Sequence, residues 1–214
     1  MESLIQQIKE HVKSLFLNVE GSHDWQHIER VWKMAVHLQK KEGGDRLLVE
    51  LAALLHDISD HKYNGGNFEL GAETAKSVLL SFGASTDLAD KVAVLVSKIS
   101  FKGAQVQDIQ GSIELAIVRD ADRLDAIGAI GIARAFAFGG SINSPLYVPD
   151  MEPTMHRSKE EYLLNRSHTI NHFHEKLFLL KDRMETNSAK DIALHRHAVM
   201  KHFIQEFMTE WDMA

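Results

Sequence analysis

The placement of helix-breaking residues constrains the fold of this chain more than any other sequence feature. All 3 prolines, Pro145, Pro149 and Pro153, fall within one nine-residue window of the 214-residue chain. Elsewhere, single or paired glycines separate long blocks that are rich in Ala, Leu, Glu, Lys and Ile. Because proline disrupts helices and these residues favour them, such blocks indicate helices. No run alternates polar and apolar residues between hairpin turn signals, so the sequence predicts an all-α protein.

The apolar periodicity and the capping residues predict eight helices in one compact multi-helix bundle with a C-terminal helical extension. Asp24 and Ser85 are expected to be N-caps, and Gly43-Gly44 and Gly83 are expected to end helices. The expected helices cover residues 2–17, 24–42, 45–58, 67–82, 85–97, 112–138 (straight or kinked), 158–185 and 188–211.

We expect three parts along the chain. Residues 1–140 form the helical core that carries the functional site, and residues 158–214 form two C-terminal helices packed on it. Residues 141–157 are irregular, and they contain Tyr147, Met151 and Met155, which is an apolar composition for a linker. Long irregular loops are often functional, so we interpret this segment as a lid or pocket rim. The alternative is an ordinary ordered crossover.

Composition excludes several classes of protein. The chain has no cysteine, which excludes disulfides, thiolate zinc sites, iron–sulfur clusters and cysteine nucleophiles. Its formal net charge of -6 argues against broad binding of nucleic acid or anionic membranes. No run of about 18 apolar residues predicts a membrane span, and the first residues lack the apolar core of a signal peptide. We therefore expect a soluble cytoplasmic protein.

Polar residues in apolar surroundings mark the candidate site. The block Leu47–Ile58 is apolar on almost every side, yet it ends with His56 and Asp57. A buried carboxylate is costly unless it is paired, hydrogen-bonded or bound to a metal ion. The alternative is that Asp57 caps a following turn while His56 donates to a carbonyl.

A second block, residues 113–126, carries three aspartates. If residues 112–138 form one continuous helix, its period places Asp122 and Asp125 on the apolar face. Asp120 falls on the opposite face, beside Arg119 and Arg123, and is expected to face solvent. Asp122 and Asp125 are therefore expected to point inward, and each needs a partner for its carboxylate.

The third block is Ser22–Val31, which contains His23 and His27. His23 precedes the expected helix, so these two histidines are not expected to share a helical face. His27, His56, Asp57 and Asp122 together form a set of two nitrogen and two oxygen donors. Such a set suits a divalent ion of the Mn, Fe, Co, Ni or Zn group better than calcium or magnesium. The spacing alone leaves open a buried polar network.

These four residues resemble the H…HD…D signature of the HD-domain metal-dependent phosphohydrolases. Blocks similar to one bacterial subfamily cover nearly the whole chain, namely residues 22–35, 50–63, 119–140, 151–158 and 169–184. Characterised relatives include nucleoside-triphosphate pyrophosphohydrolases. The resemblance implies that His27, His56, Asp57 and Asp122 hold a divalent ion.

The resemblance also implies a catalytic acid. Many relatives carry a glutamate three positions after the HD pair that helps to activate water, and here that position is Asp60. A carboxylate just beyond the metal-bearing turn suits proton transfer. The alternative is an acid that faces solvent, and His61 is a weaker candidate for the same role. Two-metal relatives have further spaced histidines before the last aspartate. Only His61 lies there, which favours one ion, with manganese or nickel preferred.

A nucleotide substrate requires local cations in this acidic chain. Lys62 and Lys98 are the preferred pair because each follows an apolar helix, and Arg30 and Arg157 are further candidates. Arg30 has an equally plausible structural role as the partner of Asp125. Tyr147 is a candidate to stack on a base. The histidines of the last third are expected to be packing residues.

We therefore predict hydrolysis of (deoxy)nucleoside triphosphates to monophosphate and pyrophosphate. The alternatives are another HD-type phosphohydrolase, acting on nucleoside monophosphates or an alarmone, and a non-catalytic metal-dependent nucleotide sensor. The expected partner is a small nucleotide, with no nucleic acid or membrane, and the chain is expected to be a monomer or a homodimer.

Overall fold

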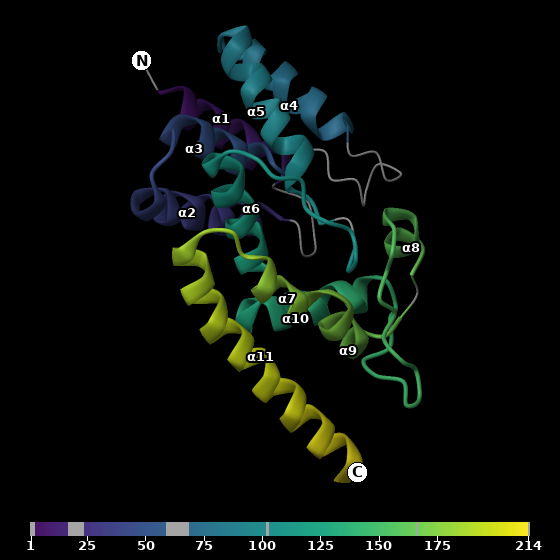
Figure 1. Ribbon diagram of the computed structural model, residues 1–214. Coiled ribbons are helices and arrows are strands. Elements are labelled where there is room, and N and C mark those ends of the chain that lie inside the picture. Colours follow the sequence, from purple (N-terminus) through teal and green to yellow (C-terminus); the bar gives the residue numbers. More distant parts are fainter. Residues whose placement is uncertain (1–2, 17–23, 59–68, 102, 166, 214) are drawn as a thin grey trace. The chain divides into compact units, whose positions relative to one another are not determined.

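The computed structural model describes residues 3–16, 24–58, 69–101, 103–165 and 167–213. Within these ranges the regular structure is helical and no strand is present, which confirms the predicted all-α class (Figure 1). None of the described helices combines the length and the apolar character that crossing a bilayer requires.

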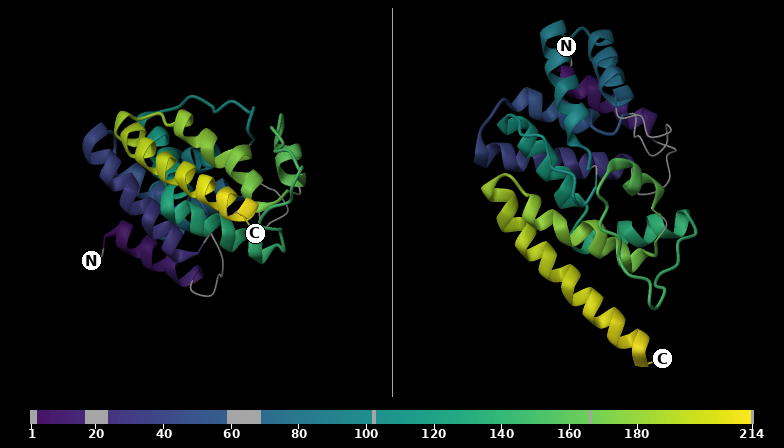
Figure 2. Two further views of the ribbon diagram at one scale, coloured as in Figure 1. Left: turned by 90° about the horizontal axis from the view of Figure 1, so that it is seen from below. Right: turned by 45° about the vertical axis from the view of Figure 1, so that its right-hand side comes forward.

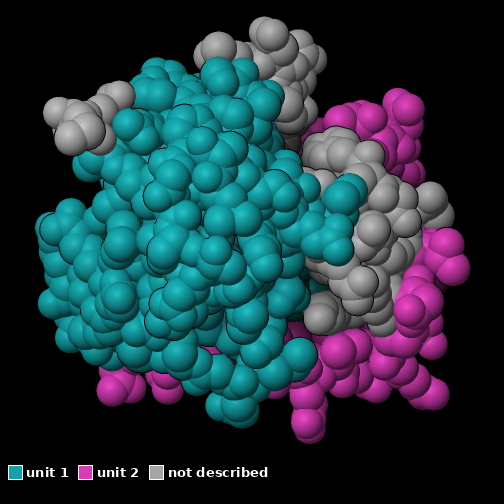
Figure 3. Space-filling view, turned by 90° about the horizontal axis from the view of Figure 1, so that it is seen from above, with its two compact units in different colours: residues 1–101, 109–121 teal, residues 102–108, 122–214 magenta. Residues whose placement is uncertain are grey.

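The chain forms two compact units (Figure 3). Unit 1 comprises Met1–Phe101 and Ile109–Ala121, and unit 2 comprises Lys102–Asp108 and Asp122–Ala214. Helix α6 (Ile113–Asp125) therefore begins in unit 1 and ends in unit 2. The three-part division at residues 140 and 157 stays a prediction.

Unit 1 is organised around helix α3. Residues 49–55 of this helix are all buried, as its nearly uninterrupted apolar sequence predicts. Helices α1, α2 and α5 pack against α3, while α4 and α5 form a helical hairpin that is visible in Figure 1. The helices of this unit, besides the first part of α6, are α1 (Leu4–Leu15), α2 (Trp25–Glu42), α3 (Arg46–Leu55), α4 (Glu69–Ser81) and α5 (Thr86–Ile99).

Unit 2 packs shorter elements against one long helix, α11 (Asn187–Met213), shown in yellow in Figure 2. Phe173 is fully buried and contacts the rings of Phe136, Phe178 and Phe203 at centroid distances of 6.2, 6.0 and 6.0 Å. The remaining elements are α7 (Gly128–Ser141), α8 (Lys159–Leu164), α9 (Thr169–His172), the π-helical turn η1 (Phe173–Leu177), α10 (Phe178–Leu180) and the 3-10 turn η2 (Lys181–Arg183).

The helix predicted over residues 112–138 divides into α6 and α7 at Gly128. The φ of Gly128 is 79°, in the left-handed region that favours glycine. A Cβ there would lie 2.9 Å from Cγ of Arg196, so the side chain of Arg196 passes close to the glycine backbone. Arg196 Nη1 also donates to the carbonyl of Leu124 at 2.5 Å, which satisfies a terminal carbonyl of α6.

The single helix predicted over residues 158–185 was wrong, because the chain leaves the helical conformation at Asn165. It resumes at α9, where His168 is the N-cap and its Nδ1 accepts from the backbone N–H of Asn171 at 3.1 Å. Because an imidazole takes the place of the usual Ser, Thr, Asp or Asn acceptor, the N-cap preferences of amino acids did not predict the start of helix α9.

The segment 141–157 is hydrogen-bonded along its length within unit 2. The carbonyls of Pro145 and Leu146 accept from the backbone N–H groups of Thr169 and Ile170 at 2.9 and 3.0 Å. Further along, the Asn171 amide donates to the carbonyl of Met151 at 2.9 Å. Its role as a lid stays a prediction.

The His168 cap predicts a pH-dependent stability. Burial lowers the pKa of His168 from its ordinary value of 6.5. The imidazole of His168 is therefore protonated more readily in the unfolded chain than in the folded chain. The contribution of the neutral ring to the free energy of unfolding is complete above pH 6.5 and is lost as the pH falls below 6.5. The substitution His168→Asn keeps a capping acceptor that does not titrate. We expect the free energy of unfolding in urea to fall less between pH 7.5 and 5.5 in this variant than in the parent chain, and equal losses would contradict the assignment.

Candidate metal centre

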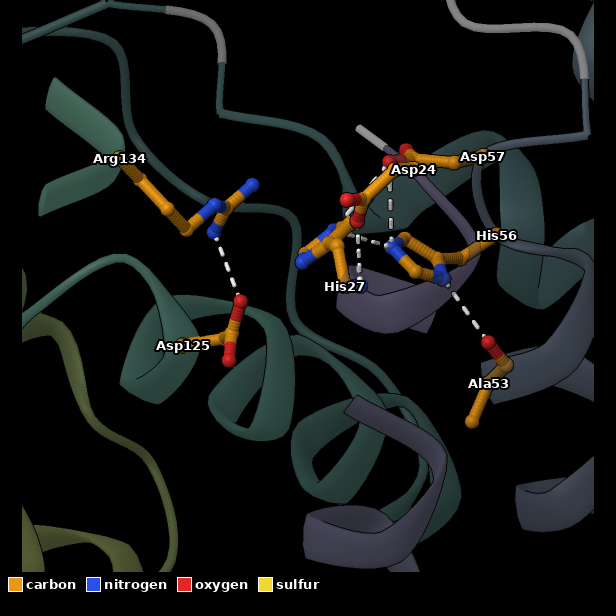
Figure 4. A network of polar contacts seen from close by, with 7 residues as sticks. All are labelled: Asp24, His27, Ala53, His56, Asp57, Asp125 and Arg134. Atoms are coloured by element: carbon orange, nitrogen blue, oxygen red, sulfur yellow. Dashed lines mark hydrogen bonds and ion pairs between the residues drawn. The ribbon is translucent and has the colours of Figure 1, made fainter. Parts of the chain in front are cut away.

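Three donor atoms of unit 1 meet at the ends of helices α2 and α3 (Figure 4). Nε2 of His27 lies 3.2 Å from Nε2 of His56. Oδ2 of Asp57 lies 3.3 Å from the first nitrogen and 3.4 Å from the second. His27 is fully buried, and the Asp57 side chain is only 12% exposed. The two histidines and the aspartate, which the sequence analysis selected from two separate stretches, therefore converge within unit 1.

A backbone contact sets the tautomer of His56. Its Nδ1 lies 2.8 Å from the carbonyl oxygen of Ala53, which can only accept, so Nδ1 carries the proton in the neutral ring. Nε2 then presents a lone pair toward His27 and the Asp57 carboxylate. Two acceptors at this separation repel each other unless a proton or a cation lies between them. This arrangement, in which the second ring nitrogen is held by a carbonyl, is typical of metal-bound histidine.

The triangle has the size that a single divalent ion requires. Its edges are 3.2, 3.3 and 3.4 Å. Such a triangle has a circumradius of about 1.9 Å, so the spacing of the three donors is compatible with one shared ion at about 2.0–2.2 Å, the usual distance for nitrogen and carboxylate ligands. The donor set of two imidazoles and a carboxylate suits Mn, Fe, Co, Ni or Zn. The residues therefore fit a divalent metal ion.

The local sequence explains why these side chains converge. Asp24 is the N-cap of α2, as predicted, and its Oδ1 accepts from the backbone N–H of His27 at 2.8 Å. The cap therefore holds the turn that carries the first ligand (Figure 4). The other two ligands follow α3 directly, since this helix ends at Leu55. The sequence analysis recognised Asp24 only as a cap, although its spacing of three residues from His27 already placed the two together.

Replacing Asp24 tests this support. We expect Asp24→Ala to lower the free energy of unfolding by about 1 kcal/mol, the usual cost of losing an N-cap acceptor. It should also weaken metal binding, because the turn that carries His27 loses its fixed position. Asp24→Asn keeps an acceptor and should preserve both. Urea unfolding and manganese titration measure the two effects, and equal metal affinity in all three proteins would contradict a positioning role.

Comparisons with known proteins agree with this geometry. The model of the HD domain family matches residues 24–127, a range that contains every donor of the centre. YpgQ of Bacillus subtilis is 35% identical over 202 residues, which cover 94% of this chain and 90% of YpgQ. The chain belongs to the HD-domain family. By the function of that family, the chain is a metal-dependent phosphohydrolase.

Solved structures resemble the HD-domain chain over nearly its whole length. A protein of Lactobacillus plantarum has a TM-score of 0.89 at 34% identity and covers 100% of this chain and 99% of its own. An HD-superfamily hydrolase of Bacillus thuringiensis has a TM-score of 0.74 at 38% identity, with coverage of 98% and 97%. YpgQ in complex with ADP has a TM-score of 0.72 at 33% identity, with coverage of 96% and 97%.

The predicted fourth ligand, Asp122, belongs to unit 2, whereas the other three belong to unit 1. Asp122 is partly exposed. Its place in the ligand set of the HD domain therefore stays a proposal. Asp60, His61 and Lys62 lie outside the described residues, as does His23.

The other predicted substrate residues are placed as follows. In unit 1, Lys98 and Arg30 are partly buried, and the carbonyl of Lys98 accepts from Arg119 Nη2 at 2.8 Å. In unit 2, the Arg157 side chain is exposed. The Tyr147 ring packs at 5.1 Å from His168 and 5.2 Å from Trp211, in an aromatic cluster. The roles of these four residues stay proposals.

The expectation that Asp120 faces solvent was wrong. Asp120 is fully buried, and Arg119 and Arg123 are 1% and 3% exposed. A helical wheel assumes one open face, but α6 is covered on both sides. Within unit 1, Arg119 Nη2 donates to the carbonyls of Lys98 and Ile109, and within unit 2, Arg123 pairs with Asp108 at 2.7 Å.

The inward position of Asp125 is confirmed, since this residue is 5% exposed. Its Oδ2 pairs with Nη1 of Arg134 at 2.9 Å within unit 2 (Figure 4). The sequence analysis had considered Arg30 as its partner, and that pairing stays a prediction. A carboxylate that already has an arginine partner in its own unit satisfies the requirement that a buried charge be paired.

Proposed function

We propose that the chain hydrolyses (deoxy)nucleoside triphosphates to the monophosphate and pyrophosphate, using one divalent ion, with manganese or nickel preferred. The observation that carries the proposal is the triangle of His27, His56 and Asp57, which fits one ion of that group. The ADP complex of YpgQ supports a nucleotide as the ligand, because this relative is 35% identical over 202 residues.

The proposed roles follow from the chemistry of each side chain. A bound divalent ion would supply a Lewis acid and lower the pKa of water toward neutrality. His27, His56 and Asp57, with Asp122 as the fourth ligand, would hold the ion. Asp60 would accept the proton from the attacking water, and His61 is the second candidate for this step.

Cationic and aromatic side chains would position the substrate. We propose that four cationic side chains bind the phosphate oxygens, namely Lys62, Lys98, Arg30 and Arg157. Their positive charges would stabilise the negative charge on these oxygens during attack at the α-phosphorus. Tyr147 is proposed to stack on the base.

The test is the identity of the released product. The purified chain is assayed with manganese, cobalt or nickel against nucleoside and deoxynucleoside triphosphates, and phosphate and pyrophosphate are measured separately. Pyrophosphate with a monophosphate supports the proposal. Release of phosphate from nucleoside monophosphates, or hydrolysis of an alarmone, would replace it with the alternative phosphohydrolase. Nucleotide binding without turnover would favour the sensor. An Asp57→Ala preparation controls for contaminating phosphatases.

A further inference from the structure

One buried histidine of unit 2 holds the turn to which segment 141–157 is attached. His168 is 1% exposed, and its Nδ1 accepts from the backbone N–H of Asn171 at 3.1 Å. An N-cap acceptor fixes the first turn of the helix that follows it. Helix α9 has only four residues, so this first turn is nearly the whole helix, and its conformation depends on the cap.

The capped turn is hydrogen-bonded to segment 141–157. Three of its donors bind carbonyl oxygens of the segment, namely the backbone N–H groups of Thr169 and Ile170 and the side-chain amide of Asn171, which donate to Pro145, Leu146 and Met151. Just before the cap, the hydroxyl of Ser144 donates to the carbonyl of Ser167 at 2.7 Å. The attachment of residues 144–151 therefore depends on the geometry of residues 167–171.

Protonation of His168 removes the cap. Both ring nitrogens of an imidazolium carry a proton, so Nδ1 can no longer accept from Asn171, and two N–H donors then face each other. A buried cation also requires nearby acceptors or an opposite charge. The carboxylate of Glu175 is the acid that acts on this ring, but both of its oxygens already accept hydrogen bonds, from Thr154 and from Asn165 at 3.0 Å each.

Three elements pack around this ring. From segment 141–157, Tyr147 meets the ring of His168 edge to face at 5.1 Å between centroids. The π-helical turn η1 contributes the titratable groups His174 and Glu175. Helix α7 packs against α9 where Gly139 lies beside Thr169, and a glycine brings no titratable group there.

The balance of these influences favours the neutral ring. Burial lowers the pKa of His168, and this effect outweighs the carbonyl of Met151 and the carboxylate of Glu175, which raise it. His174 lowers the pKa further. The neutral, capping form of His168 is therefore the one that the closed structure stabilises.

We propose that His168 is a pH-sensitive latch that holds segment 141–157 on helix α9. With the neutral ring, the cap is made and residues 144–151 are bound to the turn 167–171. With the charged ring, this turn opens and the segment is released from it. Because the open form binds the proton more readily, the closed form is favoured above pH 6.5 and is lost as the pH falls below 6.5. The latch goes beyond the proposed function, since it involves neither the metal ion nor the nucleotide.

The first experiment measures the ring and the turn in the same full chain. ¹⁵N-histidine spectra, assigned by the signals missing in His168→Asn, give the protonation midpoint of His168 and should show an unprotonated Nδ1 at pH 7.5. Hydrogen exchange of the Thr169 and Ile170 amides, corrected for intrinsic rates, should accelerate below pH 6.5 by up to about tenfold per pH unit, because one proton is bound. Exchange that does not follow the midpoint of His168 would overturn the proposal.

The second experiment follows the segment itself. The chain has no cysteine, so Glu152→Cys at an exposed position provides a unique site for a nitroxide spin label. The mobility of this label should rise as the pH falls from 7.5 to 5.5. Adding His168→Asn supplies a capping acceptor that does not titrate, and the label should then stay immobile over the same range. An equal rise in both proteins would contradict the latch.

His197→Asn is the matched control for these measurements. His197 lies on α11 in the same unit, and burial lowers its pKa as well. The labelled chain with this substitution should keep the response of the parent chain, and loss of the response would assign the opening to another histidine and overturn the proposal. If His168→Asn does not fold, the ¹⁵N signal that titrates together with amide exchange in the parent chain decides, because no histidine with this midpoint would exclude the latch.

Discussion

Asp57→Ala is expected to abolish metal binding and to reduce turnover by more than about a hundredfold. Loss of an outer partner of a metal ligand already costs about 10- to 100-fold, and Asp57 is a direct candidate ligand. Its removal takes away the only anionic donor of the triangle. The two remaining donors are the Nε2 atoms of His27 and His56, which lie 3.2 Å apart. Asp57 lies after the end of α3, so the helix itself should persist.

Stability offers a readout that does not depend on turnover. An ion that binds only the folded chain, at about 100 times its dissociation constant, raises the free energy of unfolding by about 2.7 kcal/mol. We expect manganese to stabilise the parent chain in this way and to leave Asp57→Ala unchanged. Asp90→Ala is the matched control, because this carboxylate of α5 is 50% exposed and pairs with Lys76. Manganese stabilisation that survives in Asp57→Ala would refute the assignment of this ligand.

Phe173→Ala is expected to cause the largest loss of stability, about 3–5 kcal/mol. Phe173 is fully buried and contacts Phe136 of α7, Phe178 of α10 and Phe203 of α11, so its removal leaves a cavity where three elements of unit 2 meet. Since domains of this kind are stable by about 5–15 kcal/mol, the loss is a large fraction of the total. Urea unfolding followed by circular dichroism measures it.

Phe207→Ala is the matched comparison for this core. Phe207 belongs to the same aromatic cluster, where its ring lies 6.3 Å from Phe136, but it is only partly buried. A partly solvated ring contributes less transfer free energy and leaves a smaller cavity. We therefore expect less than half of the loss caused by Phe173→Ala. Equal losses in the two variants would show that packing at Phe173 is not what holds unit 2 together.

The candidate site was predictable as far as its unit 1 ligands are concerned. His56 and Asp57 stood out because they end a block that is otherwise apolar, and His27 because it opens the α2 helix behind a good N-cap. Neither sequence feature predicts the distances between the donor atoms. These depend on how α2 and α3 pack, since side chains that are 29 residues apart meet only in the folded chain.

The errors have a common physical cause. The helical wheel that placed Asp120 in solvent treats a helix as having one covered face, but arginines beside it are buried by donating to backbone carbonyls. The predicted helix over residues 158–185 failed because His168 caps a new helix with its ring nitrogen. Both depend on partners far along the chain or on an unusual capping group.

What the sequence determined by itself was the helical class, most helix limits in unit 1 and the three residues whose donor atoms form the candidate metal centre. These follow from local properties, namely breaker placement, apolar period, capping residues and polar side chains in apolar blocks. Only the tertiary structure decided which donors meet, which tautomer His56 adopts, and that the ring nitrogens of His156 are buried without a hydrogen-bond partner in the part of the chain that the structure describes. These depend on the packing of segments distant in sequence, because hydrogen bonding and burial are properties of neighbours in space.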